Sequence, residues 1–287
     1  MIPTMSGLAR PEILATTEWL AEHIGRPGVR ILDARWRPDG TGAEVHRAGH
    51  IPGAVSVDWR ADLVDMDQAG DAIRVAAPGR VAATAARAGI GDETTIVVYD
   101  DTQGLYAARV WWTFRAYGAE HVRVLDGGFP AWEAEGRPVE RGAGDPPAEP
   151  LTPFVPRGPN RLHLTTSDVR GLLGAPGVTL LDARAPAEYR GFEGNTRRLG
   201  HIPGAINVPV GSMHTAGSQR LRDGGDLRDR LHAANVSRGP RVVAYDGSGV
   251  AAAKLAFVLS LLGHDDVAVY DGGWAEWGNR LDLPVDR

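Results

Sequence analysis

The sequence predicts an α/β protein made of two copies of one domain, each a parallel sheet with helices on both faces. Three observations lead to this prediction. The chain has 287 residues, a length that suits two domains. Four short sequence blocks occur twice in the same order, and short apolar segments alternate with helical patterns throughout. Strands that alternate with helices need crossover connections, and these connections produce parallel sheets covered on both faces.

The repeated blocks lie at matching places in the two halves of the chain. The first half contains Ile31–Arg35, Gly49–Ala54, Val97–Asp100 and Leu125–Gly128, and the second contains Leu180–Arg184, Gly200–Ala205, Val243–Asp246 and Tyr270–Gly273. Because chance does not preserve four blocks in one order, we interpret the chain as a duplication.

The segment between the two copies, residues 142–159, is rich in proline. The prolines are at positions 146, 147, 150, 153, 156 and 159. Each proline lacks a backbone N–H donor, so neither a helix interior nor a central strand can form there. We therefore predict a semi-rigid linker at 142–159, with domains at 8–141 and 160–287.

Within each copy the expected elements follow one order. The first copy predicts helix 17–24, strand 29–33, strand 54–57, helix 78–88, strand 95–99, helix 107–117 and strand 123–125. The second copy predicts helix 167–173, strand 178–182, strand 205–208, helix 226–234, strand 241–245, helix 250–262 and strand 268–270. Thr17 followed by Glu18 suits the start of the first helix.

Composition narrows the function classes. The formal net charge is −5 at pH 7, so no general basic field is available to bind nucleic acid. No apolar run comes near 18 residues, and the first residues lack the layout of a signal peptide. We therefore expect a cytoplasmic protein with no membrane partner. The chain has no cysteine, which excludes disulfides, thiolate metal sites and a cysteine nucleophile, and we expect no metal and no cofactor.

The segment after strand 241–245 is the candidate functional site. Ligands of open α/β sheets bind beyond the carboxyl ends of the strands. Asp246 ends this strand, Gly247-Ser248-Gly249 follows, and a helix begins near Val250. The glycines permit a tight loop whose N–H groups converge beside the positive end of the helix, an arrangement that binds anions. The alternative is an ordinary strand-to-helix turn in which Asp246 caps the helix.

These blocks resemble the tandem rhodanese-domain sulfurtransferases, the family of thiosulfate and 3-mercaptopyruvate sulfurtransferases. The resemblance rests on Asp182–Arg184, Gly200–Ala205, the loop Asp246–Val250 and Asp271–Trp274, and it covers nearly the whole chain. It implies two rhodanese-like domains, the first of the non-catalytic type and the second carrying the active loop. In this family a cysteine at the first loop position forms a persulfide and passes its sulfur to cyanide or another thiophile.

The sequence departs from the family pattern at three positions. Asp246 stands where the family has its cysteine, and a carboxylate cannot form a persulfide. Ala251 stands where the family commonly has threonine, and Glu188 where it often has an arginine that binds the anionic group of the donor. We therefore predict a sulfurtransferase homologue that is inactive by the persulfide route. The alternatives are activity by another route, an anion-binding or regulatory module, and an Asp-based phosphoryl hydrolase.

Four other residues are candidates for contact with a small anionic sulfur compound, the ligand class that the resemblance implies. They are Arg184, Arg197, Arg198 and Trp36, the last reaching the site from the first domain. Pairing with Asp182 is the alternative for Arg184, and core packing is the alternative for Trp36. Arg60 and Arg109 are weaker candidates of the same kind. No protein partner follows from the sequence.

Three more expectations concern side chains around the loop and the core. Asp246 is expected to accept N–H bonds from its own loop, stay ionised and have a lowered pKa. His50 and His201, in matching blocks, are expected to make structural hydrogen bonds. Of the neighbouring Trp111 and Trp112, we expect one in the core and one facing the other domain.

Overall fold

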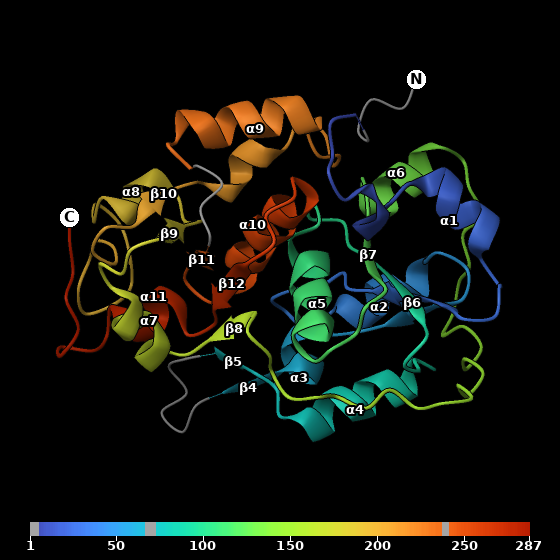
Figure 1. Ribbon diagram of the computed structural model, residues 1–287. Coiled ribbons are helices and arrows are strands. Elements are labelled where there is room, and N and C mark those ends of the chain that lie inside the picture. The colour runs from blue at the N-terminus through green and yellow to red at the C-terminus, as the bar shows by residue number, and fades with distance from the viewer. Residues whose placement is uncertain (1–5, 67–72, 237–240) are drawn as a thin grey trace.

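The computed structural model describes residues 6–66, 73–236 and 241–287 (Figure 1). Two five-stranded sheets form, one from each half of the chain, and every strand pair within them is parallel. Helices flank both sheets (Figure 1). The prediction of an α/β fold with two related parallel sheets is therefore confirmed.

The elements of the first half begin with a short 3-10 helix and end with a helix before the linker. They are η1 (Pro11–Ile13), β1 (Leu14–Ala15), α1 (Thr17–His23), β2 (Val29–Asp33), α2 (Gly42–Ala48), β3 (Ala54–Ser56), α3 (Trp59–Leu63), β4 (Val64–Met66), β5 (Ile73–Val75), α4 (Pro78–Arg87), β6 (Thr95–Tyr99), α5 (Leu105–Ala116), β7 (Val122–Leu125) and α6 (Gly128–Ala134). Helix α1 starts at Thr17 as predicted, because the Thr16 side chain accepts a hydrogen bond from Trp19 N and caps the helix.

The second half repeats this series. Its elements are β8 (His163–Leu164), α7 (Thr166–Leu172), β9 (Val178–Asp182), α8 (Pro186–Tyr189), β10 (Ile206–Asn207), η2 (Val210–Met213), α9 (Gly224–Ala233), β11 (Arg241–Tyr245), α10 (Val250–Leu261), β12 (Val267–Tyr270) and α11 (Gly273–Trp277). The sheet orders, β3-β2-β6-β7-β1 and β10-β9-β11-β12-β8, place corresponding strands at corresponding positions. The central strands β6 and β11 therefore end in two equivalent loops.

Each predicted helix and strand is present, with ends shifted by no more than a few residues. The sequence patterns missed the short elements, among them the edge strands β1 and β8 and the antiparallel pair β4–β5. Elements of two or three residues are too short to show a period, so pattern reading does not detect them. The domain and linker boundaries at 8–141, 142–159 and 160–287 stay predictions.

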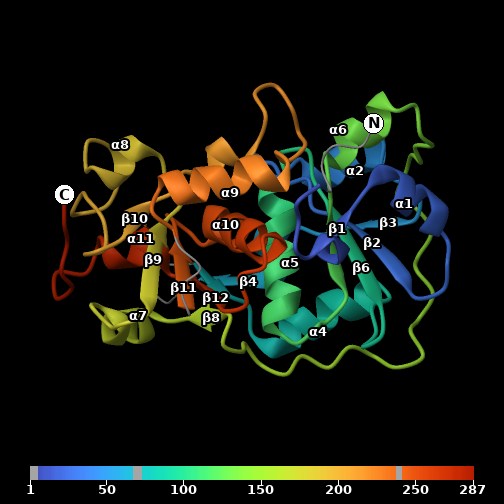
Figure 2. The ribbon, with the colours of Figure 1, turned by 45° about the horizontal axis from the view of Figure 1, so that its top comes forward.

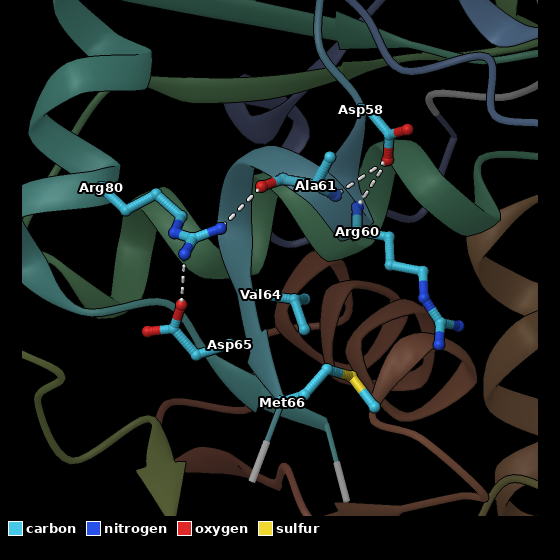
Figure 3. Close-up of a pocket in the computed structure, with 7 residues that line it drawn as sticks. All are labelled: Asp58, Arg60, Ala61, Val64, Asp65, Met66 and Arg80. Carbon is cyan, nitrogen blue, oxygen red and sulfur yellow. Dashed lines mark hydrogen bonds and ion pairs between the residues drawn. The ribbon is translucent and has the colours of Figure 1, made fainter. Parts of the chain in front are cut away.

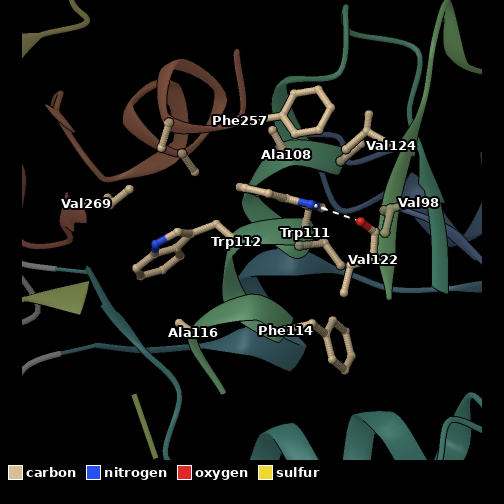
Figure 4. Close-up of a cluster of buried hydrophobic side chains, with 14 of the residues drawn as sticks. Val98, Ala108, Trp111, Trp112, Phe114, Ala116, Val122, Val124, Phe257 and Val269 are labelled. Atoms are coloured by element: carbon tan, nitrogen blue, oxygen red, sulfur yellow. Dashed lines mark hydrogen bonds between the residues drawn. The ribbon is translucent and has the colours of Figure 1, made fainter. Parts of the chain in front are cut away.

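Helices α5 and α10 pack against each other between the two sheets, as Figures 1 and 2 show from two directions. The Trp111 and Phe257 rings meet edge-to-face with centroids 5.1 Å apart (Figure 4). Trp112 donates from Nε1 to the Leu162 carbonyl at 3.0 Å. Both tryptophans therefore contact the second half, and the expectation that only one would do so is wrong: side chains on two sides of α5 both meet the second half.

Within the described residues, every helix falls short of the length and apolar character that crossing a membrane needs.

Candidate functional site

The loop after β11 holds the Asp246 carboxylate against its own backbone. Asp246 is 6% exposed, and its Oδ2 accepts a hydrogen bond from Ala251 N at 3.1 Å. Gly249 has φ +76°, the left-handed conformation that glycine adopts without strain, and α10 begins at the next residue. The carboxylate therefore lies at the positive end of α10, where an anion would bind.

Burial raises the pKa of Asp246 above its ordinary value of 3.8. The N–H groups of Ala251, Ser248, Gly249 and Ala252 act in the opposite direction but do not outweigh burial. Our expectation of a lowered pKa is wrong, because it counted the N–H groups and left out the loss of solvation. Within the described ranges the other carboxylate oxygen, Oδ1, has no hydrogen-bond partner.

The equivalent loop of the first half has the same arrangement. Asp100 is 1% exposed, and its carboxylate accepts hydrogen bonds from the backbone N–H groups of four residues. The donors, at 2.8–3.0 Å, are Thr102, Gly104, Tyr106 and Ala107. Burial also raises the pKa of Asp100. In both halves a buried aspartate follows the central strand and fills the loop, and the Asp100 carboxylate caps the start of α5.

A cation from the first half holds the loop of the second. Arg109 on α5 is fully buried, and its Nη1 donates to the Gly249 carbonyl at 3.1 Å and to Asp271 Oδ1 at 2.5 Å. A Cβ on residue 249 would lie 2.5 Å from Arg109 Nη1, so glycine is required for this approach. Asp271 also accepts a hydrogen bond from Val75 N. The loop conformation thus depends on side chains from both halves.

The second half brings Lys254, the only lysine in the chain, to the equivalent loop of the first half. Lys254 lies on α10 at the position that corresponds to Arg109 on α5. Together with Gly104 and Asp126 it lines a small cavity of about 10 Å³, space for about one water molecule. Burial lowers the pKa of Lys254 to about 8, while the negative charge of Asp100 acts in the opposite direction.

A family model described as the rhodanese-like domain matches this chain twice, at residues 16–135 and 165–280. The chain belongs to the rhodanese family. Its two sheets and equivalent loops are therefore two rhodanese-like domains.

Relatives in this family align along nearly the whole chain. A Mycobacterium tuberculosis protein named provisionally as thiosulfate sulfurtransferase SseB is 40% identical over 288 residues, covering 97% of this chain and 98% of the relative. The 3-mercaptopyruvate sulfurtransferase of Escherichia coli is 33% identical, with 94% and 96% covered. The crystal structure of SseA from Escherichia coli, a 3-mercaptopyruvate enzyme, has a TM-score of 0.80 and 30% identity, covering 91% of this chain and 98% of that one.

Arg184, a candidate for anion binding in this rhodanese chain, is committed to its own strand end. Its guanidinium donates to both carboxylate oxygens of Asp182, at 2.5–3.1 Å, and to the Gly200 carbonyl at 2.8 Å. In the first rhodanese domain Arg35 makes the same bonds to Asp33 and to the Gly49 carbonyl. Because both domains repeat the pair, the alternative prediction of a structural Asp–Arg pair is confirmed.

The remaining charged candidates do not gather at the loop. Arg198 donates to the carbonyls of Leu283 at 2.5 Å and Trp277 at 3.0 Å, near the carboxyl end of the chain. The backbone N–H of Arg197 donates to Asn279, and Arg197 is exposed. The Glu188 side chain accepts from Ala185 N at 3.3 Å on α8. These contacts show what occupies Arg198 and Glu188, and none of them involves Gly247, Ser248, Val250 or another residue of the loop.

Two of the three first-domain candidates, Trp36 and Arg60, have their described contacts within their own domain. The half-buried Trp36 ring packs edge-to-face against Trp59 and Tyr106, with centroids 5.7 and 5.3 Å away. Arg60 lines a pocket of about 600 Å³ and points away from the Arg80–Asp65 ion pair (Figure 3). In the described part of the chain, the first-domain candidate that reaches the loop is Arg109 on α5, which contacts the Gly249 carbonyl.

The two histidines of the repeated blocks make the structural hydrogen bonds that the sequence predicts. His50 Nδ1 lies 2.9 Å from the His46 carbonyl, and the two rings stack with centroids 3.8 Å apart. His201 Nδ1 lies 2.9 Å from the Tyr189 carbonyl and stacks on that ring in the same way.

Asp246→Asn is expected to stabilise the protein by about 1–3 kcal/mol at pH 7, because it removes a buried charge whose Oδ1 is unpaired. The folded pKa of Asp246 is raised, so its stabilising contribution is present below the ordinary value of 3.8 and is lost as the pH rises through the folded pKa. The gain should therefore shrink as the pH falls toward 4. Urea unfolding of both proteins at pH 7 and about pH 4 measures it. A gain independent of pH would contradict this account.

Proposed function

We propose that this rhodanese-family chain does not transfer sulfur by the persulfide route, because Asp246 closes the loop of the second domain. The observation that carries the proposal is the Asp246 carboxylate on Ala251 N, 3.1 Å away. A carboxylate in this position uses the N–H groups that would otherwise hold an incoming anion. It also offers no sulfur on which a persulfide could form.

The comparison between the two domains supports the same conclusion. In the first domain, which resembles the family's non-catalytic type, Asp100 fills the loop with a buried carboxylate. Asp246 makes the second loop similar to the first. Arg184, a candidate for binding an anionic donor, has both of its partners in its own domain. A binding or regulatory module is the function that these features support best.

The names of the relatives indicate the ligand class. They are named for thiosulfate and for 3-mercaptopyruvate, both small anionic sulfur compounds. If the module retains a small ligand, we propose one of this class, and we propose no nucleic-acid partner. We also propose a cytoplasmic location, which fractionation of cells followed by immunodetection of the chain tests.

The proposed inactivity is tested by thiocyanate formation from cyanide with thiosulfate or with 3-mercaptopyruvate. The purified protein is expected to give no product above the background without protein. Asp246→Cys is measured beside it: product from this variant would show that the rest of the site still supports sulfur transfer. Turnover by the unchanged protein that disappears in Asp246→Ala would overturn the proposal and would mean that Asp246 supports another route.

An Asp-based phosphoryl hydrolase is less well supported. Such an enzyme usually needs Mg²⁺ and a second carboxylate near the nucleophile. Among residues 6–66, 73–236 and 241–287, no group of three His, Asp or Glu side chains is placed to hold a metal ion. Asp271, which lies beside Gly249, is already engaged by Arg109 and by Val75 N.

A further inference from the structure

A second concave site lies between the domains, at the opposite end of α5 and α10 from the Asp246 loop. It is a groove of about 590 Å³, within the range of small-ligand sites. Ser260, near the end of α10, lines it, whereas the loop is at the start of α10. Ten residues of helix separate these positions by about 15 Å. The groove is therefore separate from the rhodanese loop.

The groove is positively charged although the whole chain is negative. Four arginines line it, Arg10, Arg115, Arg157 and Arg161, against two acidic residues, Glu120 and Asp265. Arg10 forms an ion pair with Asp265. Within the described part of the chain, the other three arginines have no carboxylate at ion-pair distance. This excess of positive charge would attract an anion.

Arg115 shows why the excess positive charge is uncompensated. Its Nη1 donates to the carbonyls of Ala119 at 3.2 Å and Glu120 at 2.8 Å, which are dipoles and not full charges. Burial lowers the pKa of Arg115, the positive charge of Arg10 adds to this effect, and the carboxylate of Glu120 opposes it. A negative group in the groove would offset a cost that the folded protein now bears.

The walls of the groove are held in place without a ligand. Asn160 donates from Nδ2 to the Arg115 carbonyl at 3.0 Å, and Arg157 N donates to the Tyr117 carbonyl at 3.1 Å. Trp112 at the base donates to Leu162 at 3.0 Å, and Figure 4 shows Trp111 and Trp112 on the same helix. A site whose walls are already ordered loses less entropy on binding.

We propose that this groove binds a small organic anion that carries two or more carboxylate or phosphate groups on an apolar body. Arg115, Arg157 and Arg161, which have no carboxylate at ion-pair distance among the described residues, would bind the charged groups of this anion. The apolar part of the lining, which includes Leu162, would contact its apolar body. The competing explanation is that the arginines only donate hydrogen bonds to the carbonyls at the end of α5. In that case the groove has no affinity for anions.

The test uses isothermal titration calorimetry on the full chain with two probes, isophthalate and inorganic pyrophosphate, and with neutral benzamide as the blank. Isophthalate, which carries two carboxylates on an apolar ring, is expected to bind with a Kd below about 1 mM at low salt, and more weakly as salt is added. Binding of pyrophosphate alone would mean that the groove recognises charge without an apolar body and would overturn the proposal. Benzamide is expected not to bind. Failure of isophthalate to saturate by about 10 mM would also overturn the proposal.

Variants locate any binding that is observed. Arg157→Ala/Arg161→Ala is expected to weaken it about tenfold or more, since both side chains are exposed, while the Arg157 N–H and the Arg161 carbonyl make hydrogen bonds that the variant keeps. Arg47→Ala/Arg190→Ala removes the same charge from exposed positions outside the groove and should have little effect. Asp265→Asn frees Arg10 and should tighten binding several-fold. Equal weakening in both double variants would overturn the proposal.

Discussion

Replacing Asp271 with alanine is expected to lower the free energy of unfolding by about 3–5 kcal/mol. Asp271 Oδ1 is the carboxylate partner of Arg109, which is fully buried. Within the described ranges Arg109 Nε and Nη2 already lack partners, so the variant would leave the guanidinium with the Gly249 carbonyl alone. A buried charge without its counter-ion costs far more than an exposed one, because no water replaces the lost partner.

Urea unfolding at pH 7 measures this cost, and the matched control is Arg220→Ala. Arg220 contacts Asp126, the carboxylate that corresponds to Asp271 at the other loop, at 3.3 Å, and Glu135 at 2.6 Å, but 32% of its side chain is exposed. The Asp126 side chain is buried, but it keeps the hydrogen bond from Leu221 N at 3.0 Å, and the removed cation is partly exposed, so a smaller loss than for Asp271→Ala is expected. If the two variants lost the same stability, the burial of Arg109 would not be what matters.

The second large effect is expected for Asp182→Ala, which should also lower the free energy of unfolding by about 3–5 kcal/mol. The variant removes both carboxylate oxygens that accept hydrogen bonds from Arg184. The Arg184 guanidinium stays buried against the Trp274 ring, so its charge loses its counter-ion without gaining water. Asp33→Ala should cost at least as much, because Asp33 makes the same bonds to Arg35 in the first domain and its Oδ2 also lies 2.9 Å from His46 Nδ1. Large costs for both variants would identify the pair as part of the fold in both domains.

Thermal and urea unfolding of both variants measure these costs, with Asp282→Ala as the control. Asp282 forms an ion pair with Arg280 at 2.7 Å, and both side chains are about half exposed. Its loss should change stability far less than the loss of Asp182, because solvent screens an exposed pair. A small effect for Asp182→Ala beside a large one for Asp33→Ala would mean that Arg184 is not held as Arg35 is, and would return it to the candidates for ligand binding.

The fold was predictable because its signals are local and repeated. Strands such as β6 and β11 are continuous apolar runs, and the repeated blocks indicate where equivalent strands lie. Short elements such as β8 were not predictable, because a two-residue strand forms only when β12 is beside it. Their existence depends on tertiary contacts and not on local preference.

The site was predictable in identity but not in environment. The sequence placed Asp246 at the loop and the N–H groups around it, and the structure has Ala251 N donating to it. It gave no measure of burial, so the direction of the pKa shift was wrong. From the sequence Arg109 is only a weak candidate, because no local pattern indicates that a side chain of α5 contacts a loop 140 residues later in the chain.

The reciprocal contacts between the halves have a consequence for how this protein can change over evolutionary time. Arg109 of the first half reaches Gly249, while Lys254 of the second lines the cavity at Gly104. Neither half contains everything that completes its own loop. After a duplication, one copy is normally free to diverge or to be lost. Here each copy supplies residues that contact the loop of the other copy. Selection on either loop therefore acts on both halves together.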